Sequence, residues 1–220
     1  MTNSLPDFDA IYAGRADTAG IDQVPWNIGA PQPAIAALID AGRVSGDVLD
    51  AGCGVGETAL YLAARGHSVV GLDLSPTAVG QARRSAEERG LTAEFAVADI
   101  TSFTGYDGHF ATVIDSTLFH SIPVASRSPY LAAIAKASAP GAVLHVLVFT
   151  KELDFPEGEG PNTVDEPELR AAVEEHWSVE SVVPSSVEAI LPPTIAPCSP
   201  RNSRGRVLLP AFLLTARRKD

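Results

Sequence analysis

Three alternating glycines follow directly on a short apolar run that ends in an acid. The stretch is DAGCGVG, residues 50–56, and residues typical of a helix begin at Glu57. Glycine weakens the interior of a helix or strand, so this spacing is expected where the backbone turns sharply and a ligand comes close to it. The stretch restricts the possible folds more than any other, because it predicts a strand, a tight turn and a helix in direct succession.

The segments around this stretch alternate between strands and helices. Strands are predicted at 48–50, 68–73, 94–98, 111–114 and 142–149, and helices at 57–65, 76–89 and 129–137. Ser75 is suited to cap the second of these helices and Gly90 to end it. Apolar strands separated by helices are typical of a parallel sheet with helices on both faces. The predicted fold is therefore a Rossmann-like α/β fold.

The remaining segments complete one predicted domain of 220 residues. Residues 1–43 precede the sheet and are expected to form a cap over the cofactor and substrate site, while residues 44–150 form the cofactor-binding core. Residues 151–167 are rich in Pro, Gly and acids and are interpreted as a lid loop. A short helix follows, and then two apolar segments, 177–191 and 206–218, which are predicted to pair as antiparallel strands.

Charge and composition restrict the possible partners. The formal net charge of −11 argues against nucleic acid and anionic membranes, because both require a basic surface. No apolar run is long enough to span a bilayer. Two cysteines are too few for a disulfide framework, and no Cys/His cluster has the spacing of a metal site. These features favour a cytoplasmic protein that contains no metal and binds a small molecule.

The spacing of the glycines distinguishes between possible ligands. In an open parallel sheet, ligands bind beyond the carboxyl ends of the strands, where residues 50–56 lie. A dinucleotide fingerprint is G-x-G-x-x-G, whereas this chain has G-x-G-x-G with Asp50 in front of it. A carboxylate there would repel a pyrophosphate and attract an ammonium group. Two alternatives stay open: an NAD-dependent dehydrogenase, which Asp73 would also suit, and a tight turn without a ligand.

Residues 50–56 resemble motif I of the class I S-adenosylmethionine-dependent methyltransferases. The resemblance extends to acids at the ends of the next three predicted strands, Asp73, Asp99 and Asp115. It implies that Asp73 binds the ribose hydroxyls, that Asp99 binds the adenine amino group with Ile100 on the ring, and that Asp115 lies beside the methionine part. The cofactor residues expected from the sheet are Asp50, Gly52, Cys53, Gly54, Asp73, Leu74, Asp99, Ile100 and Asp115.

Further segments sharpen this resemblance. FDAIY, VPWNIGAPQP, GLDLSPTA, FAVADIT and DSTLFHSIP are similar to the small actinobacterial methyltransferases of the heterocyclic-toxin (benzoquinone-methyltransferase-like) group, relatives of thiopurine methyltransferase. The resemblance implies a seven-stranded, mostly parallel sheet with an antiparallel C-terminal strand. It also implies that Trp26 and Gln32 fold over S-adenosylmethionine, whose product is S-adenosylhomocysteine, and that the protein is a monomer or a homodimer.

The resemblance implies methylation of the O or N of a small aromatic or heterocyclic molecule, such as a hydroxyquinolone-like toxin, with detoxification as its purpose. Thiopurine-type S-methylation, quinone or phenol O-methylation in biosynthesis, and a cofactor-binding module without catalysis remain alternatives. Methyl transfer from a sulfonium requires mainly orientation and exclusion of water, and a base only for a protonated acceptor. His120 is the candidate base, or it only lines the pocket. The expected substrate pocket is aromatic and apolar, from Phe8, Tyr12, Trp26 and Phe119, with Phe149 or Phe155.

Overall fold

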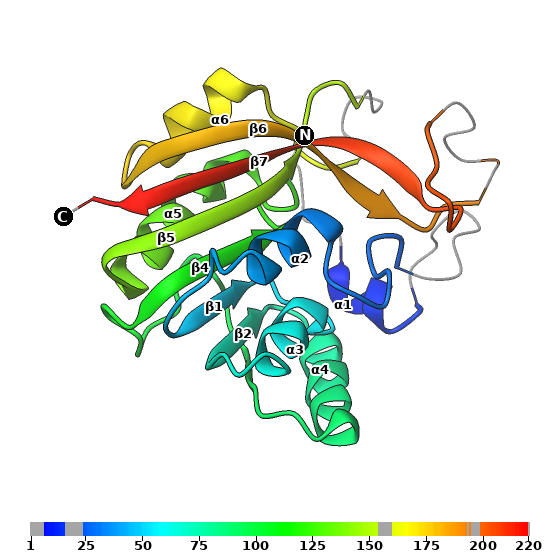
Figure 1. Cartoon of the computed structure of the whole chain (residues 1–220), viewed down its shortest axis with the longest axis horizontal. Helices are drawn as coiled ribbons and strands as arrows, with labels where there is room; N and C mark the ends of the chain where they lie inside the picture. Colours follow the sequence, from blue (N-terminus) through cyan, green and yellow to red (C-terminus); the bar gives the residue numbers. More distant parts are fainter. Residues whose placement is uncertain (1–6, 16–23, 154–159, 193, 195–198, 220) are drawn as a thin grey trace.

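The computed structural model describes residues 7–15, 24–153, 160–192, 194 and 199–219, and its centre is one seven-stranded sheet (Figure 1). The strands are β1 (Val48–Ala51), β2 (Val69–Asp73), β3 (Glu94–Val97), β4 (Phe110–Ser116), β5 (Ser138–Phe149), β6 (Trp177–Ala189) and β7 (Val207–Arg218). Their order in the sheet is β3-β2-β1-β4-β5-β7-β6. The first five strands are mutually parallel, and β7 runs antiparallel to both β5 and β6. The predicted mostly parallel sheet with an antiparallel C-terminal strand is confirmed.

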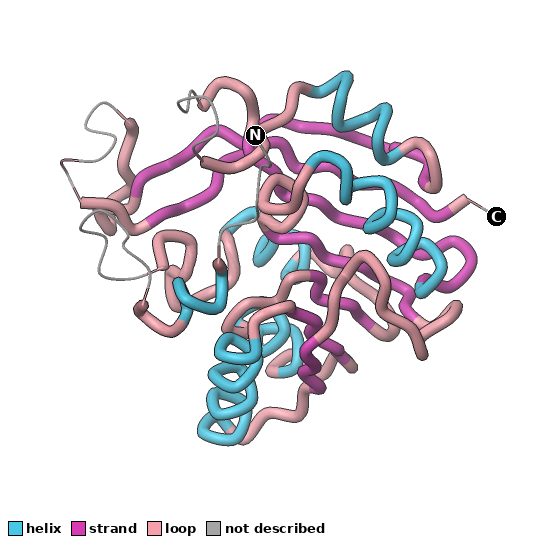
Figure 2. The backbone as a smooth tube through the Cα atoms, turned by 180° about the vertical axis from the view of Figure 1, so that it is seen from behind, coloured by secondary structure: helices cyan, strands magenta, loops and turns pink. Residues whose placement is uncertain are grey.

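Helices pack on both faces of this sheet (Figures 1 and 2). They are α1 (Phe8–Tyr12), α2 (Pro33–Asp40), α3 (Glu57–Ala63), α4 (Pro76–Arg89), α5 (Arg127–Ala137) and α6 (Glu166–Val173), with a 3₁₀ turn at Val124–Ser126. One core lies between the sheet and α2, α3 and α4, and the other between the sheet and α5 and α6. Side chains along β1 point alternately to the two faces of the sheet, so β1 contributes to both cores. Val48 belongs to the first core, and Leu49 and Ala51 belong to the second.

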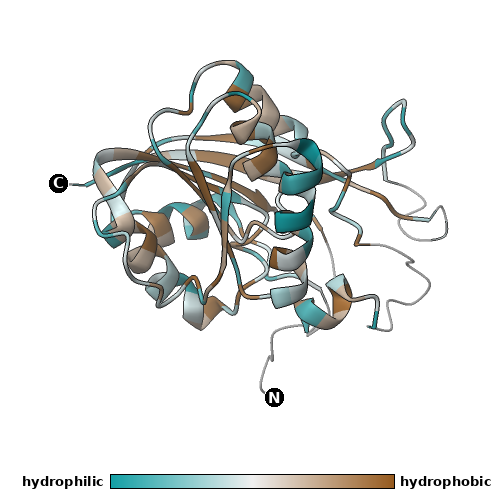
Figure 3. Ribbon diagram, turned by 90° about the horizontal axis from the view of Figure 1, so that it is seen from below, coloured by the Kyte–Doolittle hydropathy of each residue, from teal (hydrophilic) through white to brown (hydrophobic). Residues whose placement is uncertain are grey.

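Apolar strands lie between polar helix surfaces, as Figure 3 shows in the brown strands at the centre of the molecule. The residues predicted to begin and end α4 do so in the structure. Ser75 caps α4, its side-chain oxygen accepting a hydrogen bond of 3.1 Å from the Ala78 N–H. Gly90 ends α4 with φ +62°, a left-handed conformation that glycine adopts without strain. Within the described residues, no helix is long and apolar enough to cross a membrane.

The β6–β7 hairpin extends past the C-terminal end of β5. β7 pairs with β5 only as far as Ala211, whereas its pairing with β6 continues to Val207. The end of the hairpin therefore projects past the carboxyl edge of the sheet (Figure 1). There it meets the N-terminal segment 24–32, and the Ile190 N–H donates to the Pro25 carbonyl at 2.8 Å. This contact joins segment 24–32 to the end of the hairpin beside the carboxyl ends of the parallel strands.

Candidate active site

A cavity of about 230 Å³ lies at the carboxyl ends of β1 to β4. Most of the site residues predicted from sequence line it: Phe8, Tyr12, Trp26, Gln32, Asp50, Gly52, Cys53, Gly54, Asp73, Leu74, Asp99 and Ile100. Four others are not among its lining residues: Asp115, Phe119, His120 and Phe149. Phe155 lies outside the residues that the structure describes. All of the predicted cofactor residues except Asp115 are thus brought together, whereas the predicted acceptor residues are divided between the cavity lining and the structure behind it.

The glycine turn after β1 forms one wall of the cavity. Gly52 and Gly54 have φ of +68° and +53°, in the left-handed region. A Cβ on Gly52 would lie 2.8 Å from the Leu118 side chain, and one on Gly54 would lie 2.7 Å from the Tyr12 hydroxyl oxygen. Both positions therefore need glycine for conformation and for space.

Asp73 joins this turn to the loop after β2. Its Oδ2 accepts a hydrogen bond of 2.8 Å from the Gly54 N–H, and its Oδ1 accepts one of 2.9 Å from the Ser75 N–H. Burial raises the pKa of this carboxyl. Asp99, after β3, is exposed, and its Oδ1 accepts from the Thr101 N–H at 2.8 Å. Asp99 is thus held by an N–H at the end of its own strand, and Asp73 by N–H groups beyond the ends of both β1 and β2.

Asp50 and Asp115 are both buried, but only Asp50 lines the cavity. Asp50 accepts a hydrogen bond of 3.0 Å from the Ala59 N–H. Burial, with Asp73 and Asp115 nearby, raises its pKa to about 7. Asp115 accepts from the Leu118 N–H at 2.8 Å and from the Tyr130 hydroxyl at 2.8 Å, and burial raises its pKa to about 7. Asp115 therefore supports the loop after β4 from beneath.

The cavity wall is acidic. Its described lining carries the carboxylates Asp50, Glu57, Asp73 and Asp99 and includes no Lys, Arg or His. Such a wall attracts a ligand with a positive charge and repels one with phosphates. A dinucleotide therefore fits poorly, whereas a molecule with sulfonium and ammonium groups fits the charge of the cavity.

Helix α1 covers the cavity and is attached to α4 at both of its ends. The Asp9 carboxylate accepts hydrogen bonds from the Ser75 hydroxyl at 2.7 Å and the Thr77 N–H at 2.9 Å, and these bonds, the Ser75 one foremost, lower its pKa to about 2. At the other end, the Gln81 side chain donates to the Tyr12 carbonyl at 3.1 Å. The Asp9 contact was missed in the sequence, since nothing local links an acid in α1 to the start of α4, more than sixty residues later.

Trp26 and Gln32 occupy the segment between α1 and α2. Trp26 donates from Nε1 to the Tyr12 hydroxyl at 3.3 Å. The Gln32 amide is engaged by the protein: its Oε1 accepts from the Glu188 N–H at 2.8 Å, and its Nε2 donates to the carbonyls of Glu188 at 3.0 Å and Trp26 at 3.3 Å. Gln32 therefore attaches the Trp26 segment to the end of the β6–β7 hairpin.

The loop after β4, residues 117–126, forms the opposite wall. Asn162 holds it by donating from its N–H to the His120 carbonyl at 2.7 Å and from its side chain to the Ile122 carbonyl at 2.9 Å. Arg127 is buried, donates to the Asn162 carbonyl, and lies with its guanidinium carbon 4.7 Å from the centre of the Phe119 ring. Phe119 thus packs behind the cavity wall rather than in it.

His120 is buried in this loop with 3% of its surface exposed. Its Nδ1 accepts a hydrogen bond of 3.0 Å from the Phe149 N–H, and the two rings stack with centroids 4.1 Å apart. Burial, followed by the charge of Arg127, lowers its pKa to about 3. The ring is therefore neutral at physiological pH, and the lone pair on Nδ1 is already used.

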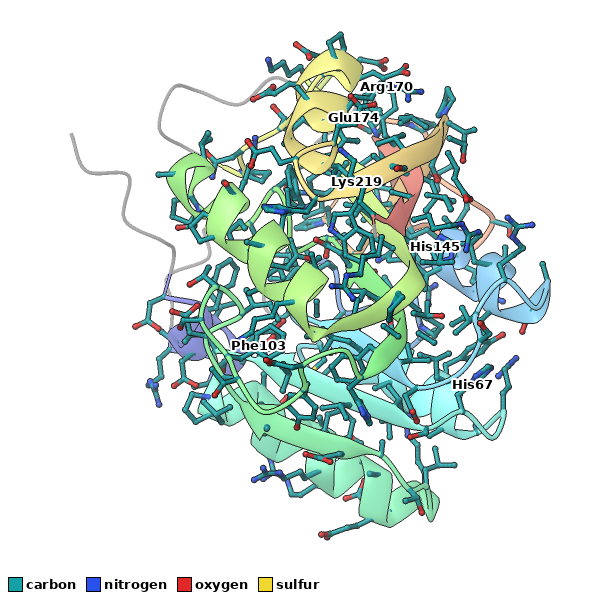
Figure 4. All side chains as sticks on the ribbon, turned by 90° about the vertical axis from the view of Figure 1, so that its left-hand side faces the viewer. His67, Phe103, His145, Arg170, Glu174 and Lys219 are labelled. Atoms are coloured by element: carbon teal, nitrogen blue, oxygen red, sulfur yellow. The ribbon has the colours of Figure 1, made fainter. Side chains whose placement is uncertain are left out.

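Other histidines lie farther from the cavity. Figure 4 looks onto the amino edge of the sheet, where it labels His67 and His145. His67 precedes β2, and His145 is buried in β5, 3.0 Å from the Thr215 hydroxyl. Within the described residues, no group of three or more His, Cys, Asp or Glu side chains could hold a metal ion.

Comparison with known proteins agrees with this geometry. Residues 48–141 match a methyltransferase domain family. The 2-heptyl-1-hydroxyquinolin-4(1H)-one methyltransferase of Mycobacteroides abscessus is 53% identical over 191 residues, which are 86% of this chain and 84% of that relative. The chain therefore belongs to the class I S-adenosylmethionine-dependent methyltransferases, and the enzyme class predicted from sequence is confirmed.

Solved structures show the same fold. One, from a study of the conversion of a disulfide bond into a thioacetal group during echinomycin biosynthesis, has 37% identity and a TM-score of 0.83 over 96% of this chain and 92% of its own. Magnesium protoporphyrin IX methyltransferase from Synechocystis with bound S-adenosylmethionine has 22% identity and a TM-score of 0.61, over 84% of this chain and 76% of its own. At 22% identity the second similarity concerns the fold alone.

Proposed function

We propose that this chain transfers the methyl group of S-adenosylmethionine to the ring-bound oxygen of a small hydroxyquinolone-like heterocycle, and that this reaction detoxifies the heterocycle. The observation that carries the proposal is the 53% identity, over most of both chains, to a methyltransferase named for such a heterocycle. The cavity supports it, since its lining includes Phe8, Trp26, Ile122 and Pro123, apolar side chains suited to a flat acceptor.

The residues present fit the cofactor. The acidic wall suits its positive charges, and Gly52 and Gly54 present bare backbone to the cavity. We assign Asp50, Gly52, Cys53 and Gly54 to its methionine part. Asp73, Leu74, Asp99 and Ile100 are assigned to its adenosine part, Trp26 covers it, and Asp115 and Gln32 support the walls. When bound, S-adenosylmethionine supplies a methyl group already activated on a positively charged sulfur.

The chain's own contribution is orientation and exclusion of water. As the methyl group moves, its bond to sulfur breaks, a bond to the acceptor oxygen forms, and the sulfur becomes neutral. An N-hydroxyl is acidic enough to enter as its anion, so no proton has to be removed, and the described lining includes no Lys, Arg or His. For His120 we favour the second of the two sequence interpretations: with Nδ1 bonded to the Phe149 N–H, it shapes the pocket rather than acting as the base.

A product assay tests the proposed function. Purified full-length protein and S-adenosylmethionine should convert 2-heptyl-1-hydroxyquinolin-4(1H)-one to its O-methyl product, detected by mass spectrometry. A phenol, an aryl thiol and an N-heterocycle without the hydroxyl serve as comparison acceptors. Turnover of the thiol alone would support S-methylation instead, and cofactor binding without any product would support a catalytically silent module.

The role of His120 needs its own measurement. His120→Phe keeps the stacking on Phe149 and removes the ring nitrogens. If His120 only shapes the pocket, kcat should change by less than about tenfold, with the main effect on the acceptor KM. A loss of about a hundredfold or more in kcat, recovered at high pH, would instead identify His120 as the base.

A further inference from the structure

Thr117 has an unusual backbone conformation at the edge of the cavity. Its φ is +78°, and it is the only non-glycine residue with positive φ among the residues that the structure describes. Threonine branches at Cβ, so a left-handed conformation is more strained for it than for most residues. Strain of this kind persists where the surrounding structure imposes it, and it occurs frequently at functional sites.

The backbone of Thr117 is fully engaged, and its side chain is not. Its N–H donates to the Leu147 carbonyl at 3.0 Å, and its carbonyl accepts from the Ser121 hydroxyl at 2.8 Å. Within the described ranges, the Thr117 hydroxyl has no hydrogen-bond partner in the protein. Glycine could make both backbone contacts with less strain, so the contacts alone do not explain a threonine here.

The location of Thr117 indicates what its hydroxyl could contact. Thr117 lines the cavity directly after β4. The next residue, Leu118, packs against the glycine turn at Gly52, and Ile122 and Pro123 of the same loop also line the cavity. Thr117 therefore lies in the lining between the end of β4 and the apolar residues of the loop after it.

We infer that the Thr117 hydroxyl donates a hydrogen bond to the ionised oxygen of the acceptor and so aims that oxygen at the methyl group. This inference rests on the proposed function, since it requires an acceptor that binds as an oxyanion. A neutral hydroxyl suits this task, because it stabilises the anion with one hydrogen bond and leaves its negative charge available for attack. Thr117 is thus an acceptor-binding residue that was not among the site residues predicted from the sequence.

Three substitutions in the full chain separate the hydroxyl from the backbone conformation. Thr117→Val keeps the branched shape and removes the hydroxyl, Thr117→Ser keeps the hydroxyl, and Thr117→Gly removes the strain and the side chain together. Thr104→Val is the matched control, an exposed threonine outside the cavity lining. Each variant is assayed with 2-heptyl-1-hydroxyquinolin-4(1H)-one and S-adenosylmethionine, and its thermal midpoint is recorded.

For Thr117→Val we expect kcat/KM for the acceptor to fall by about ten- to a hundredfold, as for a lost hydrogen bond to a charged group, with the cofactor KM unchanged. The acid limb of its kcat profile should move up by about one pH unit, because the bound anion loses a donor. Thr117→Ser should keep most of the activity. Thr117→Gly should lose it while its thermal midpoint holds or rises, which separates the inferred role from a structural one.

The outcomes are distinguishable. If the wild-type chain methylates the hydroxyquinolone and Thr117→Val or Thr117→Gly stays within about twofold of it, the inference is overturned and the proposed function stands. If the wild-type chain binds S-adenosylmethionine and converts no oxygen acceptor, the proposed function fails and the inference fails with it.

Discussion

The two ends of the cavity are built by different means. At the cofactor end, the acids Asp50, Asp73 and Asp99 lie at or near strand ends, and each carboxylate accepts from a backbone N–H, as Asp73 does from Ser75. At the acceptor end, segments far apart in sequence hold one another. Asn162 bonds to Ile122 across 40 residues, and Gln32 bonds to Glu188 across 156. The cofactor end therefore follows from the parallel sheet, whereas the acceptor end depends on how loops and termini dock onto it.

This difference has a functional consequence. A site made of strand ends keeps its geometry while the loops around it change, so one cofactor serves many methyltransferases. The acceptor end can change through Asn162, Arg127 or the hairpin end without disturbing the sheet. Substitutions at the two ends should accordingly separate cofactor binding from acceptor turnover.

The largest effect is expected at the cofactor end, from Gly54→Val. The new side chain would meet the Tyr12 hydroxyl, since even a Cβ lies 2.7 Å from that oxygen at a φ of +53°. Calorimetry should detect no binding of S-adenosylhomocysteine, a loss of more than about a hundredfold. Gly90→Val is the control, because Gly90 has a φ of +62° and nothing within 4 Å of the added Cβ. Equal loss of binding in both variants would mean that backbone strain, and not the cavity, is responsible.

Asp73→Asn tests the same end more gently. The amide keeps the shape of the side chain but replaces one acceptor oxygen with an NH2 donor. That NH2 group would face the N–H of either Gly54 or Ser75, and the hydrogen bond there would be lost. The affinity for S-adenosylhomocysteine should fall by about ten- to a hundredfold, which corresponds to the loss of one charge-assisted hydrogen bond. The turnover rate at saturating cofactor should stay within about threefold of the wild type, because the acceptor end is untouched. A large fall in kcat at saturation would show that the two ends are not separable.

A third test uses pH. Burial raises the pKa of Asp50 to about 7, so the empty cavity holds a largely protonated Asp50 below neutrality. A positively charged ligand binds the ionised form, so its affinity should rise as pH increases. With a pKa of 7, the ionised fraction grows from roughly a tenth at pH 6 to nine tenths at pH 8, which predicts about tenfold tighter binding.

The raised pKa of Asp50 makes ligand binding stronger as pH rises, but it makes the ligand-free protein less stable. A carboxyl whose pKa is raised on folding binds more protons in the folded chain than in the unfolded one. Its contribution therefore declines as pH rises from about 4 to about 7. Asp50→Asn should flatten both profiles, as followed by calorimetry and by thermal unfolding. Unchanged slopes in that variant would assign the titration to Asp73 or Asp115.

The same comparison explains how far the sequence could predict this structure. The strand ends at Asp50, Asp73 and Asp99 could be predicted because each acid directly follows a short apolar segment in the local sequence. The parallel strands and the pairing of β6 with β7 followed from local patterns, whereas the seven-stranded sheet with an antiparallel C-terminal strand followed from the family resemblance. His120 and Phe119 follow β4 as expected, but their directions depend on Arg127 and on the segment at Asn162, which no local pattern indicates. The left-handed Thr117 has no sequence signal, since threonine is among the residues least suited to that conformation.

The smallest effect is expected at the acceptor end, from Gln32→Met. Methionine fills a similar volume but leaves the N–H and carbonyl of Glu188 without the Gln32 amide, while the ion pair of Glu188 with Arg206 at 2.9 Å remains. The free energy that attaches the Trp26 segment to the hairpin should decrease by about 1 to 3 kcal/mol, and the acceptor KM should rise by about two- to fivefold. Trp26 is also assigned to cover the cofactor, but cofactor affinity should change less because the bonds that orient Asp50, Asp73 and Asp99 are kept.

Hydrogen exchange can localise this effect through a reciprocal control. Gln81→Met removes the bond from α4 to the Tyr12 carbonyl and leaves the hairpin contact intact. Exchange should therefore accelerate at residues 24–32 in Gln32→Met and at residues 7–15 in Gln81→Met, each with little change in the other segment. If either variant loosens both segments equally, the cover of the cavity moves as one unit. The hairpin end would then control cofactor release as well as acceptor binding, and the separation between the two ends of the cavity would not extend to its cover.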